Sequence, residues 1–330
     1  MDFLKNKKGF QMSFAWIFAI IVGAVILFLA IFFAMSLLRT GNYEINTKTA
    51  QDLSSLLDPL QTGSEEAKSD LVSLTVETRI YTSCNSRGYF GENRIRVSEE
   101  TSFLQQEWSD IGGDIPATQN QYVFAEDMIQ TKDKELYFFI MPFEMPYKVA
   151  DVMVWHTQKY CFVNPPENVE SLIDNLQNRE ESNLEVSDSG SSCSRESVSV
   201  CFGASSGCDV SVSDSCNGVN CEAYDEGIVR KNGNDVYYVG NLMYAAIFSS
   251  EDNYLCGVKR LISRVEHLSE VYGEKAKFVK SKGCGTGLVS DVNSLVSLAR
   301  NYNDLRELGV IKSKAEDIDI KNRVAVCRLY

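Results

Sequence analysis

The sequence predicts an α+β protein with a long N-terminal transmembrane helix and stem, a mixed and mainly antiparallel β ectodomain, and a C-terminal antiparallel helical pair. Three observations predict this fold. Residues 9–38 contain no charged side chain. From Leu71 apolar and polar residues alternate with period two, and after Asp252 the apolar residues follow helical spacing. Ten cysteines beyond the apolar run predict that disulfides staple the exported part.

The uncharged run is long enough to cross a bilayer. About twenty apolar residues, each rising roughly 1.5 Å in a helix, span the hydrocarbon core. A cleavable secretory signal has a shorter apolar region, about 7 to 15 residues, and ends at a small-residue cleavage site. Ile31, Phe32 and Phe33 are too bulky for such a site. We therefore expect residues 1–39 to be a retained membrane anchor, whose partner is the lipid bilayer.

The basic residues that flank the run predict its orientation. Lys5, Lys7 and Lys8 precede it, and short segments rich in Lys and Arg stay cytoplasmic. We therefore expect a single-pass protein of the cell membrane, with a cytoplasmic N-terminus and an extracytoplasmic C-terminal domain.

The charge of the exported part excludes one class of partner. Residues 1–39 carry a net charge of +3 and the whole chain −13, so residues 40–330 carry −16. Proteins that bind nucleic acids use Lys and Arg to neutralise phosphates. An acidic exterior repels phosphates, and we expect no nucleic-acid partner.

The cysteines predict a disulfide framework in an oxidising compartment. A metal site is the alternative, because four cysteines lie close together between residues 201 and 221, but no pair has C-x-x-C spacing and no histidine lies among them. We therefore predict no metal and no cofactor. The spacing leaves the connectivity open. The candidates for disulfides are Cys84, Cys161, Cys193, Cys201, Cys208, Cys216, Cys221, Cys256, Cys284 and Cys327.

The residues before the apolar run carry a family resemblance. The string KKGFQMSF, residues 7–14, resembles the class III signal segment of archaeal type IV pilin-like proteins. The resemblance implies that a peptidase cuts between Gly9 and Phe10, and that the apolar helix then packs into a filament core or stays in the membrane. Family members often carry a glutamate a few residues beyond the cut, whereas this chain has Phe14, Ala15 and Trp16 there. An ordinary N-terminal anchor with basic flanks is the alternative. The rest of the chain resembles single-span surface proteins of small-genome archaea, which implies no activity.

The first part of the exported chain divides into a stem and a mixed module. Residues 40–63 have apolar residues at helical spacing, Ile45 and Leu53 among them, and predict a partly amphipathic helical stem. In residues 64–178, β-rich alternation predicts a mainly antiparallel sheet with a short helix over residues 169–176, and Pro142 predicts an edge or a turn. The predicted strands cover residues 71–78, 89–97, 121–124, 135–141 and 149–163.

The next segment, residues 179–223, is rich in serine and cysteine and poor in large apolar residues. Such a composition buries too little surface to offset its own ordering entropy. We therefore expect an insertion that depends on disulfides, with a small hairpin formed by residues 198–202 and 210–212.

The last segment, residues 224–330, predicts a β-hairpin followed by two helices. Asn232 and Gly233 between β-rich runs are a hairpin signal. Residues 258–279 and 288–308 each carry an apolar stripe of helical spacing, and the glycines between them predict a turn. Residues 324–329 are a candidate closing strand held by Cys327.

Few residues suggest catalysis, and we predict no catalytic residue. His156 could serve a triad, but no G-x-S-x-G elbow is present. His267 lies at the border of the exposed face of its predicted helix. Acidic pairs such as residues 99–100 and 180–181 are candidates for acid–base chemistry, although most carboxylates on an acidic surface are simply solvated.

Two hypotheses about function follow from these features. The first is a non-catalytic surface protein, pilin-like or singly anchored, with a role in adhesion, envelope structure or complex assembly. Its expected partners are cell-surface proteins and other copies that contact its N-terminal helix. The second is a membrane-tethered extracellular hydrolase that uses carboxylates or His156.

Overall fold

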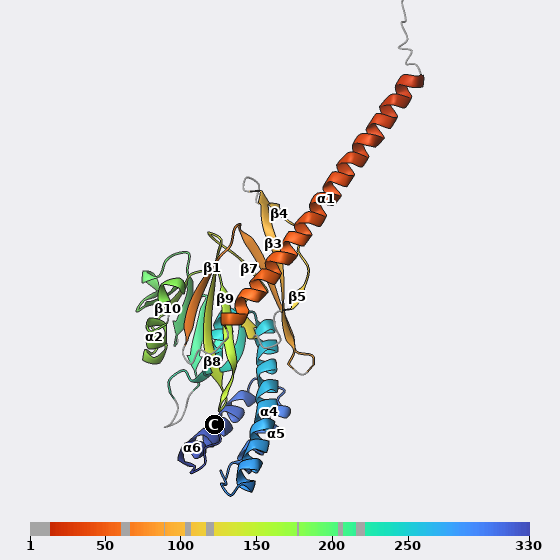
Figure 1. Cartoon of the computed structure of the whole chain (residues 1–330). Helices are drawn as coiled ribbons and strands as arrows, with labels where there is room; N and C mark the ends of the chain where they lie inside the picture. Colours follow the sequence, from red (N-terminus) through yellow and green to blue (C-terminus); the bar gives the residue numbers. More distant parts are fainter. Residues whose placement is uncertain are drawn as a thin grey trace, which may run out of the picture.

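The computed structural model describes residues 14–60, 67–88, 90–102, 107–116, 122–176, 178–203, 207–215 and 222–330. The proposed processing positions, Gly9 and Phe10, lie outside these residues, as do Cys216 and Cys221. The described chain is mixed α+β, as predicted. Figure 1 shows one long helix that projects from a domain of packed sheets, with further helices at the end of the domain opposite to the projecting part.

The projecting helix is α1, Phe14–Leu60, a single element of 47 residues. It joins the predicted anchor and the predicted stem without a break. The stem is not free, because its buried residues, Asn46, Ala50, Leu53 and Ser54, pack on the ectodomain. Ile45, another apolar residue of the predicted stem, is 54% exposed.

A four-stranded sheet in the order β1-β8-β9-β6 lies between two hydrophobic cores. Phe138 and Ile140 of β8 face one core, and Phe139 and Met141 face the other. Strand β8 is therefore buried on both faces, which explains its continuous apolar run. The β1–β8 pairing ends at Ile140, so Pro142 lies on an edge, where its missing N–H costs no ladder bond. The strands are β1 (Lys68–Ser73), β6 (Tyr122–Phe124), β8 (Glu135–Glu144) and β9 (Lys148–His156).

An antiparallel sheet in the order β4-β3-β2-β7, with β5 also paired to β3, covers one of these cores together with α1. The predicted strand over residues 71–78 is wrong in part, because the chain leaves β1 after Ser73 and turns into β2 of this second sheet. The strands are β2 (Thr78–Asn85), β3 (Glu92–Ser102), β4 (Glu107–Trp108), β5 (Ile115–Pro116) and β7 (Met128–Gln130).

The third sheet has six strands in the order β11-β10-β12-β13-β14-β15, and its β10–β11, β10–β12 and β12–β13 pairs are parallel. The predicted hairpin of residues 198–202 and 210–212 is therefore wrong. The chain loops back after β12, and the Cys201–Cys208 disulfide holds the return, so that β13 runs beside β12 in the same direction. The strands are β10 (Tyr160–Val163), β11 (Leu184–Ser187), β12 (Val198–Phe202), β13 (Val210–Asp214), β14 (Glu226–Lys231) and β15 (Asn234–Val239).

This third sheet joins strands from all three predicted segments of the exported chain beyond the stem. Strand β10 belongs to residues 64–178, β12 and β13 to residues 179–223, and the antiparallel hairpin β14–β15 to residues 224–330. Val200 and Val212 of the serine-rich segment are fully buried in the core. Helix α2 (Glu167–Asp174) connects β10 to the short helix η1 (Arg179–Glu181), and η2 (Gly190–Ser192) precedes β12.

Helices follow the third sheet: α3 (Leu242–Phe248), α4 (Glu251–Ser281), α5 (Val289–Arg300) and α6 (Glu307–Val324). The predicted pair is present as α4 and α5, which pack side by side and are joined by a turn with Gly283 and Gly287 at positive φ. The second predicted helix is wrong at its end, because α5 stops at Arg300 and α6 begins at Glu307. The predicted strand over residues 324–329 is also wrong. The chain after α6 has no regular structure there, and Cys327 is bonded to Cys284.

Candidate functional site

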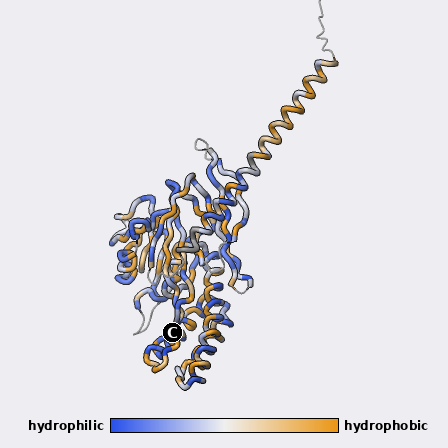
Figure 2. The backbone as a smooth tube through the Cα atoms, in the orientation of Figure 1, coloured by the Kyte–Doolittle hydropathy of each residue, from blue (hydrophilic) through white to orange (hydrophobic). Residues whose placement is uncertain are grey.

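The outer half of α1 is an exposed apolar surface. Every residue from Phe14 to Leu37 is exposed, and the described part of this run contains no charge. Figure 2 shows the run as an almost continuous hydrophobic segment that stands clear of the domain. By length and composition α1 can cross a membrane, and a signal sequence near an N-terminus has the same features. Water alone is an unfavourable environment for such a surface.

The inner half of α1 is fixed to the antiparallel sheet by polar contacts. Asn46 is 1% exposed, and its Nδ2 donates to Ser109 Oγ and to the carbonyl of Asp110, each at 2.7 Å. Thr47 Oγ1 accepts from the backbone N–H of Gly113 at 2.7 Å, and Thr49 Oγ1 donates to Glu99 at 2.6 Å. Buried polar groups of this kind are costly unless paired, so these contacts fix the angle at which α1 leaves the domain.

The sheet that binds α1 is in turn fixed to helix α4. Cys84 of β2 is bonded to Cys256 of α4, with Cα atoms 5.9 Å apart. Asn253 Nδ2 lies 3.1 Å from Thr82 Oγ1, and the guanidinium of Arg260 donates from Nε to the carbonyl of Phe90 at 2.8 Å. Helix α1, the antiparallel sheet and the long helix α4 therefore form one connected unit.

Buried Arg260 is the most unusual charged residue of this unit. It is 1% exposed, it donates to Asn93 Oδ1, and its guanidinium lies 4.7 Å from the centre of the Tyr122 ring. Burial lowers the pKa of Arg260 to about 10, which leaves it charged near neutral pH. The sequence pattern missed this residue, since an arginine in an amphipathic helix is expected on the outer face.

Four disulfides are present among the described cysteines: Cys84–Cys256, Cys161–Cys193, Cys201–Cys208 and Cys284–Cys327. They confirm the disulfide prediction for eight of the ten residues. Cys161, Cys193 and Glu185 lie close enough together for a metal site, with possible ligand atoms within 4.8 Å of one another. Because the two sulfur atoms are bonded to each other, neither is the thiolate that a metal binds.

His156 lies in the core rather than in a cleft. It is 2% exposed, and its ring is surrounded by Tyr137, Tyr160 and Phe248 with centroids 5.0 to 5.5 Å away. Burial lowers the pKa of His156 to about 4, against the smaller effect of hydrogen bonds to backbone carbonyls, Gln158 at 2.8 Å among them. The imidazole is therefore neutral near pH 7 and packed like an aromatic residue.

His267 and the two acidic pairs are also accounted for structurally. His267 is partly exposed on α4, as predicted, and its Nδ1 lies 2.7 Å from the carbonyl of Ser263. Glu99 accepts the hydrogen bond from Thr49 of α1, so it belongs to the surface of the antiparallel sheet on which α1 packs. Glu180 and Glu181 are exposed in η1. None of the described acidic pairs is brought to a histidine.

A cleft of about 870 Å³ lies between α6 and the β14–β15 hairpin. Glu226, Tyr237 and Lys312 contribute to its lining, and Tyr237 donates to Glu226 at 2.8 Å. A second cleft of about 340 Å³ shares Lys312 and is lined by Asp225 and Asn241 among others.

Several of the charges that line these clefts already have partners. Lys312 pairs with Asp225 and lies 2.6 Å from Glu316, and these hydrogen bonds outweigh burial and raise its pKa. Hydrogen bonding to Glu226 and burial raise the pKa of Tyr237. The pairs hold α6 on the hairpin, and no histidine or cysteine lines either cleft.

Comparison with known proteins finds no relative of this chain. No protein-family model matches this chain, and no curated protein or solved structure matches it. The resemblance of residues 7–14 to prepilin signal segments stays a prediction. The sequence does not predict that Asn46, Thr47 and Gly112 lie where α1 contacts the sheet. The available signals were the Gly-Gly pair after β4 and the small polar residues within a helix.

Proposed function

We propose that this chain is a membrane-anchored extracytoplasmic surface protein with a non-catalytic role in adhesion, envelope structure or complex assembly. In this proposal the outer half of α1 resides in the bilayer or packs against the same helix of other copies, in the manner of a pilin. The inner half of α1 holds the ectodomain at a fixed angle.

The observation that carries the proposal is the continuity of α1. One helix has an outer half with every side chain exposed and uncharged, and an inner half fixed to the domain through Asn46, Thr47 and Thr49. A removable signal has no need of such a rigid connection to the folded domain. An anchor does, because the connection transmits the position of the helix to the ectodomain.

The disulfides support export. Four bridges among the described residues fit an oxidising compartment, because cytosolic thiols are kept reduced. The basic residues Lys5, Lys7 and Lys8 support a cytoplasmic N-terminus. The net charge of −16 beyond residue 39 supports protein partners over nucleic acid.

Two paired substitutions test the anchor. Ile26→Arg with Leu27→Arg places two charges where the side chains are 61% and 64% exposed. The control, Tyr43→Arg with Ile45→Arg, makes the same change on the inner half, where the side chains are 50% and 54% exposed. Each arginine at the centre of a membrane helix costs about 2.5–3.5 kcal/mol. We expect the first variant, and not the control, to leave the membrane pellet after an alkaline carbonate wash.

Mass spectrometry of the unreduced, membrane-extracted protein tests processing. A mature N-terminus at Phe10 supports a pilin-like protein, and an intact Met1 supports an ordinary anchor. A mature protein that begins near Thr40, or wild type that the carbonate wash releases, contradicts the anchor itself.

A further inference from the structure

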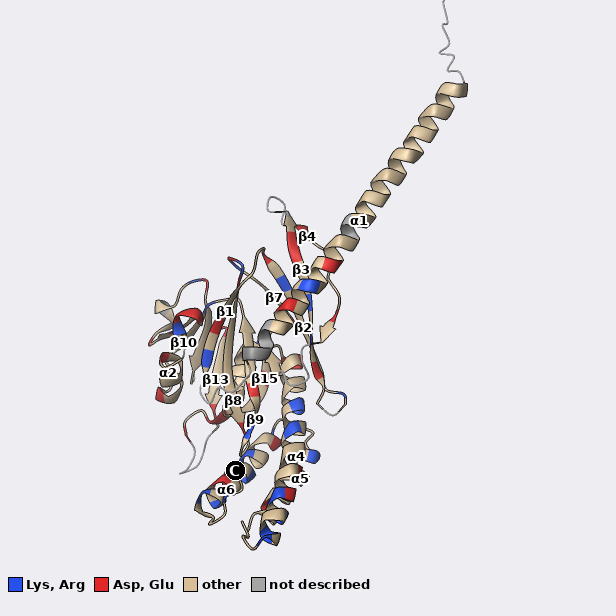
Figure 3. Cartoon of the chain, in the orientation of Figure 1, with Lys and Arg blue, Asp and Glu red and all other residues tan. Residues whose placement is uncertain are grey.

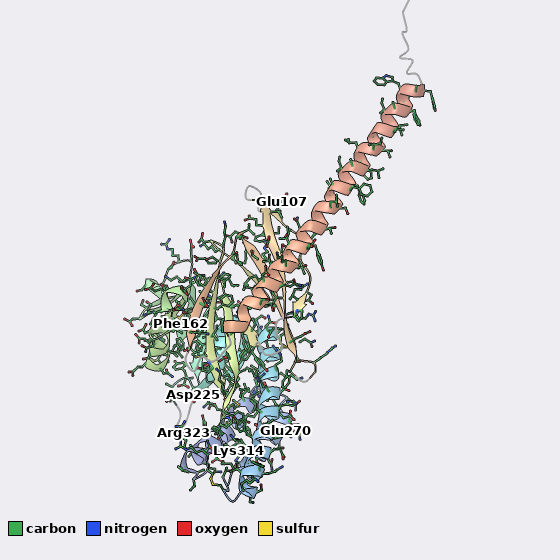
Figure 4. All side chains as sticks on the ribbon, viewed as in Figure 1. Glu107, Phe162, Asp225, Glu270, Lys314 and Arg323 are labelled. Carbon is green, nitrogen blue, oxygen red and sulfur yellow. A yellow bond between two sulfur atoms is a disulfide. The ribbon has the colours of Figure 1, made fainter. Side chains whose placement is uncertain are left out.

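The two ends of the ectodomain carry opposite charge. Residues 274–330 contain eleven Lys and Arg against seven Asp and Glu, whereas residues 40–273 contain 17 against 37. The net charges are +4 and −20. Residues 274–330 form the end of α4 together with α5, α6 and the C-terminal tail. Figure 4 places Lys314 and Arg323 at this end and Glu107 at the end from which α1 projects.

A group of lysines lies in the last two turns of α4 and directly after its last residue, Ser281. Lys275, Lys277, Lys280 and Lys282 are all exposed, and Phe278 between them is 61% exposed. We call these five residues the distal tip. Lys277 pairs with Glu274 at 2.7 Å, while the other three lysines form no ion pair with a described residue.

The cations of α6 differ from those of the distal tip. Lys314 and Lys321 both pair with Asp291 and Asp317, at distances between 2.6 and 3.1 Å. These charges are therefore largely satisfied within the helical layer. Lysines at a helix C-terminus also complement the helix dipole, but the effect is confined to the last turn, and Lys275 lies beyond it.

Exposed apolar groups accompany the lysines. Phe278 is joined by Val326, which is 98% exposed and is held near the α4–α5 turn by the Cys284–Cys327 bridge. Phe278 and Val326 therefore add exposed apolar area beside the lysines. A purely solvated charged face does not require such apolar area.

The opposite end carries an acidic surface around α1. Residues 40–60 and 92–116 contain nine Asp and Glu against three Lys and Arg. Five of these acidic residues form no ion pair with any described residue, and we call them the acidic collar: Glu44, Asp52, Glu99, Glu100 and Glu107. Tyr43 and Ile45 add exposed apolar area beside Glu44. Figure 3 shows acidic residues on the lower part of α1 and on β3–β4.

We propose that the distal tip of one copy binds the acidic collar of a second copy. The two surfaces carry opposite charge, and exposed apolar side chains lie near each of them. Because the two surfaces are different, a contact between them is heterologous, and with a displacement along α1 at each step it builds an open row of copies. This inference rests on the proposed assembly of anchored copies and names the surfaces through which their ectodomains meet.

The anchor limits which copies can make the contact. Two copies at the same level in one bilayer hold their distal tips level with each other. A tip reaches a collar only when the neighbour is displaced along α1. Copies whose α1 helices are staggered satisfy this condition, whereas a flat array in the membrane does not.

Charge reversal in the full chain tests the contact. The tip variant is Lys275→Glu, Lys280→Glu and Lys282→Glu, and the collar variant is Glu44→Lys, Glu100→Lys and Glu107→Lys. A third protein combines all six substitutions. The matched control reverses three exposed basic residues elsewhere: Lys134→Glu, Arg195→Glu and Lys259→Glu.

Self-association is measured by sedimentation velocity in detergent micelles, at about 20 mM and about 500 mM salt, where charge screening differs strongly. We expect wild type and the control to associate at low salt. Each single-surface variant should raise the dissociation constant about tenfold or more. The combined variant should recover most of the wild-type affinity, because the reversed charges attract again. Unchanged disulfide mass and protease resistance confirm folding.

Tip and collar variants that associate like wild type, or a combined variant that fails to recover although folded, overturn the proposal. So does a tip variant that loses binding to the polyanion dextran sulfate while self-association stays unchanged, because the tip then serves an anionic polymer. Carbonate extraction of the same proteins distinguishes failure of this contact from failure of the proposed membrane anchor. The tip and collar variants should stay in the membrane.

Discussion

Gly112 lies directly against Asn46 of α1. A Cβ atom on Gly112 would stand 2.7 Å from the Cβ atom of Asn46 and 2.8 Å from the backbone nitrogen of Thr47. No real side chain tolerates such distances, so the close approach of α1 to the sheet depends on this glycine. The connection between α1 and the sheet is thus built from backbone on one side and a buried amide on the other.

Gly112→Ala should loosen α1. Something must shift to admit the methyl group, and overpacking of this kind typically costs about 1–3 kcal/mol. We expect faster amide hydrogen exchange in residues 46–54 and a lower melting temperature. Gly190→Ala is the control, because a Cβ atom there has no neighbour within 4 Å. Equal exchange in the two variants would show that the docking does not depend on this contact.

The sequence was sufficient for the helix and insufficient for its docking. An uncharged run and helical spacing predict α1, because both depend only on local composition. Asn46 reads as a surface residue in any such pattern, and only its partners, Ser109 and Asp110, which are more than sixty residues away, explain its burial. The same applies to Arg260, whose partners Phe90 and Asn93 come from another layer.

The direction of strand pairing also could not be predicted from the local sequence pattern. The alternation in residues 198–202 and 210–212 predicts two strands, and both exist. Their short connection favours a hairpin, but the Cys201–Cys208 bridge and the pairing of β12 with β10 make them parallel. The helical stripe over residues 288–308 predicts one helix because Tyr302 and Leu305 continue the spacing through the break between α5 and α6.

Removal of the Cys84–Cys256 bridge should destabilise the protein more than removal of the Cys201–Cys208 bridge. Their sequence separations are 172 and 7 residues. On chain-entropy arguments the longer loop contributes about 5 kcal/mol and the shorter about 2 kcal/mol. Urea unfolding of the paired Cys→Ser variants measures the difference. A larger loss from the shorter loop would contradict the entropic account.

Reduction should first loosen the chain between β11 and β12. This segment contains the exposed Arg195, and Cys193 ties it to β10 through Cys161. We expect trypsin to cut after Arg195 early in the presence of reductant and slowly without it. Arg195→Gln should remove that early fragment. Equal resistance with and without reductant would mean that the bridge does not hold this segment.

His156 should make the protein less stable in acid. Its pKa is about 4 in the folded protein, because burial disfavours the charged ring, and about 6.5 in the unfolded chain. The unfolded chain therefore binds the proton first, and the free energy of unfolding falls as the pH falls from about 6.5 to about 4, by about 3 kcal/mol in total. His156→Phe keeps an aromatic ring among Tyr137, Tyr160 and Phe248 and removes this titration. In urea unfolding between pH 4 and pH 7 the variant should lose less stability than wild type, and His267→Gln, the control, should follow wild type. If His156→Phe and wild type lose the same stability over this range, the buried imidazole is not the group that responds to acid.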